Sequence, residues 1–421
     1  MKTSNKAFDI DSIRAQFPAL AQSFDGHPAV FLDGPGGSQV PQSVIGAISR
    51  YLSTNNANCG GTFATSRASD AVLAEAHRAV ADLLGADDAE CVIFGANMST
   101  LTLAMSRSLA RTWRRGDNII VTRLDHDANV SPWTLAAAEA GVEVRPVAFH
   151  GVDGTLDVRD LRSKLSPRTR LVAVGAASNS LGTINPLAEI VQAAHAAGAL
   201  VYVDAVHYVP HRLVDVAAWG ADFVVCSAYK FFGPHVGALW GRRALLEELP
   251  AYKVRPASND LPSRWMTGTQ NHEGIAGSLA AIEYLAEIGR RTSKDGASLG
   301  RREALTAAFE AITAYETDLA RHLLAGLAEL PKVRVWGIAD TARLDERVPT
   351  VSITHRALAS HELARQLAAA GICVWSGNFY ALSVTESLGL EPEGLVRLGL
   401  MHYNTHDEID RVLGTLSSIA E

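Results

Sequence analysis

Short apolar runs alternate with amphipathic segments through the middle of the chain. Runs of this length without polar alternation are typical of strands buried on both faces of a sheet. The predicted strands are CVIF (91–94), NIIVT (118–122), VEVRPV (142–147), RLVAVG (170–175), ALVYVD (199–204) and DFVVCS (222–227). Between them lie segments with helical spacing, such as 69–85 and 185–198, which end in Gly85 and Gly198. This alternation predicts an α/β fold, a mostly parallel sheet with helices on both faces.

The pattern changes after about residue 290. The segment 290–303 is polar and contains glycine, which is typical of a surface crossing between subdomains. Long helical stretches follow, with an alternating run at 348–354 and a capping box at 405–408 that opens a final helix. We therefore expect a large domain over 30–290 and a smaller α+β domain formed by 1–29 with 291–421.

Composition narrows the class of protein. With 421 residues, 48% of them hydrophobic, the chain can bury a large core. The net charge of -7 is mild and the basic residues are dispersed, so nothing favours nucleic acid or a membrane surface as a partner. The start has no apolar signal segment, and no stretch approaches about 18 apolar residues, so we expect a cytoplasmic protein.

The four cysteines have no spacing typical of metal ligands, so no metal site is predicted. Cys91 and Cys226 lie in strand-like runs and are expected to be buried free thiols. Cys59 lies in the polar segment NNANCGG, and Cys373 in the strand-like GICVW.

Polar residues follow the predicted strands directly. In an open parallel sheet, ligands bind beyond the carboxyl ends of the strands. The residues expected on this edge are Asp125, His126 and Asn129, then Ser178 and Asn179, then Asp204, then Ser227 and Lys230, together with the loop GANMST (95–100). The sequence thus predicts a polar site at one edge of the sheet.

This set of residues suggests pyridoxal phosphate. Lys230 offers an amine for a Schiff base, and Asp204 a carboxylate for the pyridine nitrogen. The loop 95–100 opens a helix and can present backbone N–H groups to a phosphate, with the Ser227 hydroxyl beside it. Each residue alone has an ordinary alternative. Lys230 could be a solvated loop residue, Asp204 a helix cap, and His126 a core histidine.

Seven stretches, spread over nearly the whole chain, carry a family resemblance: FLDGPGGSQVPQSVI, LDHDANVSPW, SNSLGTINP, VDAVHYVPH, SAYKFFGPHVGALWG, MTGTQNHEGI and LGLMHYNTHDEID. They resemble the class V aminotransferase group of fold-type I pyridoxal phosphate enzymes, and most closely its cysteine desulfurases. The resemblance implies the fold of a fold-type I transferase and an enzyme that uses pyridoxal 5'-phosphate.

The resemblance implies a role for each matching residue. Lys230 would form the Schiff base, and Asp204 would pair with the pyridine nitrogen. His126 would stack on the ring and assist proton transfer. Asn179 would approach the phenolic oxygen, and His207 stands beside that oxygen where desulfurases usually have glutamine.

Further matches concern the phosphate and the substrate. Ser227 and the backbone at Ala96 and Asn97 would hold the phosphate. Thr269 would reach the phosphate of a neighbouring subunit, which implies a homodimer with shared active sites. Arg397 would hold the substrate carboxylate, although an ordinary strand arginine is the alternative without the resemblance.

The chain departs from the desulfurases at two positions. Their sulfur-accepting cysteine aligns with Tyr380 in WSGNFYALS, and Cys373 lies seven residues earlier. A phenol with a pKa of about 10 cannot replace a thiolate nucleophile, so Tyr380 is expected to contact substrate instead. Tyr229 stands before the lysine where desulfurases usually have histidine.

These features favour an enzyme that acts at Cα or Cβ of an amino acid or a related amine. The reaction expected first is β-elimination by a carbon–sulfur lyase without a persulfide intermediate. Transamination and epimerisation share its early steps and stay open. A non-catalytic homologue that binds pyridoxal phosphate is a further alternative, and sulfur chemistry at Cys59 is another.

Overall fold

The computed structural model describes residues 8–419, which form a mixed α/β protein with two main sheets. The larger sheet has seven strands in the order β4-β10-β9-β8-β7-β5-β6. Its strands are β4 (Val92–Gly95), β5 (Asn118–Thr122), β6 (Glu143–Val147), β7 (Thr169–Gly175), β8 (Leu200–Asp204), β9 (Phe223–Ser227) and β10 (Gly237–Gly241). All pairs from β9 to β6 are parallel, whereas β10 runs antiparallel to β9 and β4.

The six predicted strands are confirmed, with ends shifted by at most a residue or two. The prediction missed β10, because GALWG is short and bounded by glycines, a composition that is depleted in strands. β6 is an edge strand of the sheet, and most of its side chains are at least partly exposed.

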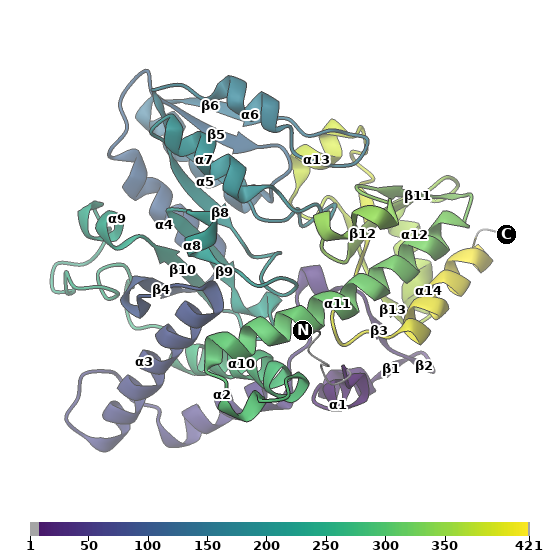
Figure 1. Cartoon of the computed structure of the whole chain (residues 1–421), viewed down its shortest axis with the longest axis horizontal. Coiled ribbons are helices and arrows are strands. Elements are labelled where there is room, and N and C mark those ends of the chain that lie inside the picture. The colour runs from purple at the N-terminus through teal and green to yellow at the C-terminus, as the bar shows by residue number, and fades with distance from the viewer. Residues whose placement is uncertain (1–7, 420–421) are drawn as a thin grey trace.

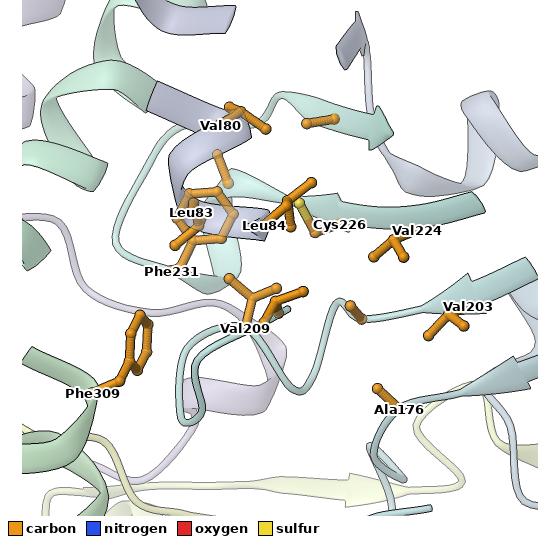
Figure 2. Close-up of a cluster of buried hydrophobic side chains, with 14 of the residues drawn as sticks. Val80, Leu83, Leu84, Ala176, Val203, Val209, Val224, Cys226, Phe231 and Phe309 are labelled. Carbon is orange, nitrogen blue, oxygen red and sulfur yellow. The ribbon is translucent and has the colours of Figure 1, made fainter. Parts of the chain in front are cut away.

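The larger sheet lies between two hydrophobic clusters, as helices on both faces require. Side chains alternate along each strand, so Val172 and Val174 of β7 enter one cluster and Leu171 and Ala173 enter the other. Figure 2 shows part of the first cluster, in which Leu84 of α3 (Ala64–Leu84) lies near Cys226 of β9. Burying a side chain such as Leu84 contributes roughly 1.5–3 kcal/mol.

The helices connect and cover the two sheets (Figure 1). They are α1 (Ile10–Arg14), α2 (Gln42–Thr54), α3 (Ala64–Leu84), α4 (Met98–Ala110), α5 (Ser131–Ala140), α6 (Val158–Lys164), α7 (Leu187–Ala196), α8 (Val216–Trp219), α9 (Arg243–Glu248), α10 (His272–Thr292), α11 (Arg301–Ala328), α12 (Ser360–Ala369), α13 (Leu382–Ser387) and α14 (His406–Ile419). Within the described part of the chain, no helix is both long and apolar enough to cross a lipid bilayer.

The smaller sheet has four antiparallel strands in the order β11-β12-β15-β14. They are β11 (Val333–Trp336), β12 (Thr350–His355), β15 (Leu395–Gly399) and β14 (Trp375–Gly377). A further short pair joins β13 (Ile372–Cys373) to β3 (Val30–Phe31), and β1 (Ser23–Phe24) pairs with β2 (His27–Pro28). The predicted capping box is confirmed, since the Glu408 N–H donates to Thr405 Oγ1 at 3.2 Å and the Thr405 N–H donates to Glu408 Oε2 at 3.1 Å.

The long helices α10 and α11 pack against each other, and α11 extends from the larger sheet toward the smaller one (Figure 1). The polar segment 290–303 joins them. Its two ends are helical, so only residues 293–300 form the connection. This arrangement fixes the smaller sheet beside the carboxyl ends of the larger one.

Candidate active site

A cavity of about 1220 Å³ lies at the carboxyl ends of β5, β7, β8 and β9. Its wall includes the first turn of α4. It also includes residues of the smaller sheet, from β14 and β15, and of the turn at 378–381. All the predicted site residues except Thr269 line it: Ala96, Asn97, His126, Asn179, Asp204, His207, Ser227, Lys230, Tyr380 and Arg397. Thr269 is exposed and lies outside this cavity.

Lys230 follows β9 in a short 3-10 turn, and its ammonium group lies inside the cavity. Its Nζ donates a hydrogen bond to the Pro35 carbonyl oxygen and lies 4.6 Å from the centre of the Tyr229 ring. Burial, helped by the charge of Arg397, lowers the pKa of Lys230 to about 7, although Asp204 opposes the shift. A substantial fraction of the amine is therefore neutral near pH 7, as a nucleophile or a base must be.

Asp204 ends β8, and the alternative that it caps a helix is excluded. The next helix, α8, begins at Val216 and has Asp215 as its cap. Asp204 Oδ1 accepts a hydrogen bond from the Val206 N–H at 2.9 Å. Among residues 8–419, no basic group lies within ion-pair distance of this carboxylate. Burial raises the pKa of Asp204 to about 7, so the carboxylate favours a cationic or proton-bearing partner in the cavity.

His126 lies between β5 and α5 and holds its ring in a fixed orientation. Its Nδ1 accepts a hydrogen bond from the Ala128 N–H at 3.0 Å, so a neutral ring carries its proton on Nε2. Burial, together with the charge of Lys230, lowers the pKa of His126 to about 4. The Tyr380 ring stacks on it, with the ring centres 5.6 Å apart and the planes 18° apart. At neutral pH this histidine therefore presents an uncharged face, suited to stacking.

Arg397 projects from β15, the central strand that pairs with both β12 and β14. Its Nη1 donates to the Asn179 carbonyl oxygen at 2.8 Å, and its guanidinium lies 4.2 Å from the centre of the Phe379 ring. Its Nε is buried without a hydrogen-bond partner, and no carboxylate among the described residues is within ion-pair distance. A buried guanidinium with free donors is suited to an anionic group of a ligand.

Asn179 and His207 are two further polar residues at the buried end of the cavity. Asn179 Nδ2 donates to the Phe379 carbonyl oxygen at 2.9 Å, while Asn179 Oδ1 is buried without a partner. His207 Nε2 lies 3.0 Å from Thr350 Oγ1, and burial keeps the pKa of His207 well below its usual value. Both residues are thus fixed by hydrogen bonds to Phe379 and Thr350, which lie in the part of the chain that carries the smaller sheet.

The first turn of α4 is suited to an anion such as phosphate. Asn97 caps the helix, with its Oδ1 accepting from the Thr100 N–H at 2.9 Å. Ser227 Oγ accepts from the Met98 N–H at 3.0 Å, which brings its hydroxyl to the same turn. A side chain at Gly237 would come within 2.5 Å of the Asn97 backbone, so only glycine lets β10 approach this loop. Backbone N–H groups, a helix N-terminus and a hydroxyl are the donors that a phosphate needs.

Three further polar residues predicted at the strand ends, Asp125, Asn129 and Ser178, form hydrogen bonds within the protein, and of these Asp125 also lines the cavity. Asp125 accepts hydrogen bonds from Thr122 Oγ1 at 2.7 Å, from the Gly175 N–H at 3.0 Å and from Asn129 Nδ2 at 2.8 Å. These bonds tie β5 to β7 beneath the cavity. Asn129 and Ser178 do not line the cavity.

Pro35, His235 and Trp375 also line the cavity, although they were not predicted as site residues. Pro35 belongs to the GPGG stretch that carried the family resemblance, so a signal was present. His235 stacks on Tyr229 at 5.1 Å, and Trp375 lies against Gly36, which has no side chain to obstruct the indole. His235 lies in the matching stretch SAYKFFGPHVGALWG, and Trp375 lies in WSGNFYALS. Neither stretch assigns these two side chains to the cavity, because only the tertiary fold brings them there.

The cysteines lie elsewhere. None of the four, all within residues 8–419, lines the cavity. Cys91 and Cys226 are buried as predicted, Cys59 is exposed and Cys373 is half-buried. Burial raises the pKa of Cys91 and Cys226 to about 12 and that of Cys373 to about 11. Burial and the Asp70 carboxylate also raise the pKa of Cys59, so all four thiols favour the protonated form.

Comparison with known proteins decides the family. The sequence pattern described as "Aminotransferase class-V" matches residues 30–305 and 299–412. The chain belongs to the class-V aminotransferase family. The members of this family use pyridoxal 5'-phosphate, and the residues of the cavity fit that cofactor, with a phosphate cradle, a partly neutral lysine and an unpaired buried carboxylate. The protein is a pyridoxal-phosphate-dependent enzyme.

Relatives span the full length of this class-V chain. A cysteine desulfurase of Dickeya dadantii is 32% identical over 427 residues, which cover 98% of this chain and 97% of its own. An aminotransferase-like protein of Gibberella zeae is 33% identical over 427 residues, with 99% and 100% coverage. Among solved structures, the apo cysteine desulfurase of Thermococcus onnurineus has a TM-score of 0.85 at 26% identity, covering 97% of this chain and 98% of its own. The S-sulfonic acid form of a desulfurase from Escherichia coli has a TM-score of 0.83 at 25% identity, with 98% coverage of both chains.

Proposed function

We propose that this enzyme eliminates a sulfur-bearing group from Cβ of an amino acid, as a carbon–sulfur lyase, without forming a persulfide on the protein. The observation that carries the proposal is the place of Tyr380. The resemblance aligns Tyr380 with the desulfurase cysteine, its ring stacks on His126 within the cavity, and none of the four thiols lines that cavity. A sulfur atom leaving Cβ therefore meets no protein thiolate and departs into solvent.

One group of cavity residues would bind the cofactor, and another would act on the substrate. Bound pyridoxal phosphate supplies an aldehyde that condenses with amines and a conjugated ring that withdraws electrons from Cα. Asp204 would hold a proton at the pyridine nitrogen through its carboxylate. Asn97, Ser227 and the first turn of α4 would hold its phosphate, and the neutral His126 would contact its ring.

Substrate activation falls to Lys230 and Arg397. Arg397 binds the substrate carboxylate with the donors that the protein leaves free. Lys230 Nζ, partly neutral near pH 7, takes the proton from Cα. Loss of that proton and departure of the group on Cβ give an unsaturated product, and hydrolysis of that product yields a keto acid and ammonia.

The test is a product screen of the purified holoenzyme with cysteine and S-substituted cysteines. The proposal predicts pyruvate in equal amount to the released sulfide or thiol, with no amino acceptor required. Alanine as the carbon product, with sulfur left on the protein, would contradict it.

Transamination is the second candidate, because a full-length relative is an aminotransferase-like protein. The two reactions differ in what happens to nitrogen. A transaminase keeps the amino group on the cofactor and needs an added keto acid for a second turnover, whereas a lyase releases ammonia. Turnover that depends strictly on an added keto acid would favour transamination, and inversion at Cα without either product would favour an epimerase.

A further inference from the structure

The cavity is polar at its buried end, which we call the floor, and apolar at its exposed opening, which we call the mouth. The polar groups of the floor are buried, with exposed fractions of 8% for Asp204 and 4% for Arg397. Three large apolar side chains line the mouth and are exposed, with fractions of 59% for Leu135, 54% for Trp375 and 74% for Tyr380. Large exposed apolar side chains that gather at the rim of a polar cavity mark a ligand-binding surface.

These three residues come from separate elements. Leu135 lies on α5, Trp375 on β14 of the smaller sheet, and Tyr380 in the turn at 378–381. Helix α5 packs against the larger sheet, whereas β14 is a strand of the smaller sheet. A local sequence pattern therefore does not explain why these three residues line one opening. Their convergence is a property of the fold at this site.

The turn that carries Tyr380 is held in a costly conformation. Phe379 and Tyr380 both have positive φ angles, 57° and 58°, which bulky residues rarely adopt. The Asp127 N–H donates to the Tyr380 carbonyl oxygen at 2.6 Å, and Asn179 Nδ2 holds the Phe379 carbonyl oxygen. Strain of this kind persists where the surroundings hold it in place, and it is concentrated at functional sites. Here it keeps the Tyr380 ring at the mouth.

We propose that the substrate is an amino acid whose side chain ends in an aromatic or long apolar group, bound by Leu135, Trp375 and Tyr380. Its carboxylate and amine would reach the floor at Arg397 and Lys230. This inference rests on the proposed function for the floor and adds the mouth. The cavity volume of about 1220 Å³ exceeds the range of roughly 300–1,000 Å³ usual for ligand sites, so it has room for such a side chain beside the cofactor.

The test measures binding rather than turnover. L-Homophenylalanine and L-2-aminoadipate have side chains of similar reach, one apolar and one anionic, and neither carries a leaving group on Cβ. Their affinities for the holoenzyme are measured from the change in visible absorbance of the bound cofactor. We expect homophenylalanine to bind about tenfold more tightly, because aromatic contacts contribute roughly 0.5–1.5 kcal/mol each.

Variants assign the preference to the mouth. The double variant Trp375→Ala/Tyr380→Ala should lose most of it, whereas Tyr252→Ala, an exposed tyrosine outside the cavity, should keep it. The single variant Trp375→Ala serves if the double variant does not fold. Equal affinities in the wild type, or an unchanged preference in the mouth variants, would overturn the inference. Tight binding of homophenylalanine without pyruvate from any S-substituted cysteine would instead overturn the lyase proposal and leave this one standing.

Discussion

At the scale of single residues, burial determines the chemistry of the site. Burial lowers the pKa values of Lys230 and His126 and raises that of Asp204. The three pKa shifts have the same largest cause, since each charged form loses hydration inside the cavity. As a result, a partly neutral amine, a neutral imidazole ring and a carboxyl group without an ion-pair partner among the described residues line the same cavity. Groups with perturbed pKa values that gather in a cleft are typical of active sites.

The pH dependence of cofactor attachment tests the Lys230 assignment. Attack on an aldehyde needs the neutral amine, so the rate should rise with pH and level off above a midpoint of about 7, where Lys230 loses its proton. The measurement is borohydride trapping of cofactor on the apo protein at a series of pH values. Lys230→Ala should trap none at the site. A midpoint near the ordinary lysine value, or full trapping in the variant, would contradict the assignment.

Asp204→Asn separates catalysis from stability. The folded-state pKa of Asp204 is about 7, above its unfolded value of 3.8, so its favourable contribution to stability is lost as pH rises toward 7. The asparagine variant of the apo protein should therefore gain stability relative to wild type over that window and keep the gain above it. Its kcat should fall by roughly 10²-fold or more, as when a buried electrostatic group is removed from an active site. Urea titration at several pH values and steady-state kinetics check the two parts, and a variant that retains most of its kcat would contradict the role.

Site residues that follow strands could be located from the sequence. Site residues that only tertiary contacts bring to the cavity could not. Asp204 and Lys230 stand directly after apolar runs, so the rule for parallel sheets located them. Asn129 and Ser178 satisfied the same rule yet have structural roles, because the rule fixes a position along the chain and not the direction of a side chain. Trp375 lies in the stretch WSGNFYALS, but the strand rule does not apply to it, because it reaches the cavity only when the two sheets come together.

At the scale of elements, the turn at 378–381 joins the two parts of the site. Its carbonyl groups accept hydrogen bonds from Asn179 and Asp127, and its side chains contact Arg397 and His126. It therefore connects the strand-end residues of the larger sheet with Arg397 of the smaller one. The predicted strands were found because they are apolar, whereas this turn could be located only by its resemblance to the desulfurase loop.

Two substitutions measure the strain in that turn. Tyr380→Gly and Tyr380→Ala remove the same ring, but only glycine adopts a φ of 58° without steric cost. The glycine variant should be more stable than the alanine variant by about 1 kcal/mol. Denaturant unfolding of both variants gives the difference. Equal or lower stability of the glycine variant would mean that Tyr380 does not hold this conformation in solution.

At the scale of the whole molecule, two clusters of buried side chains fix the larger sheet, and Figure 2 shows part of one of them. Helix α11, which packs on α10, contacts the smaller sheet and fixes it beside the larger one (Figure 1). This arrangement brings Arg397 of β15 to the carboxyl ends of β7 and β8. The sequence predicted each layer from its periodicity. It could not predict the placement of one sheet against the other, since that depends on packing between residues hundreds of positions apart.

We propose that the molecule acts as a homodimer in which Thr269, exposed and remote from its own cavity, completes the site of the other subunit. Mixing two inactive or weakened variants tests this. In a heterodimer of Lys230→Ala with Thr269→Val, one site has both Lys230 and the threonine of the other subunit. Subunits exchanged under mild denaturant should therefore regain activity that neither variant has alone. Activity equal to the average of the two separate variants would contradict a shared site.

The most direct test of the lyase account is the fate of sulfur on the protein. The wild-type enzyme is incubated with cysteine, quenched with an alkylating reagent and analysed by mass spectrometry, with any added sulfur mapped to Cys59, Cys91, Cys226 or Cys373. Because no thiol lines the cavity and all four favour the protonated form, we expect no stoichiometric added sulfur, and we expect any sulfur released to appear as free sulfide together with pyruvate. A stoichiometric persulfide on one cysteine that forms and decays at the rate of turnover would contradict the account and make the enzyme a desulfurase.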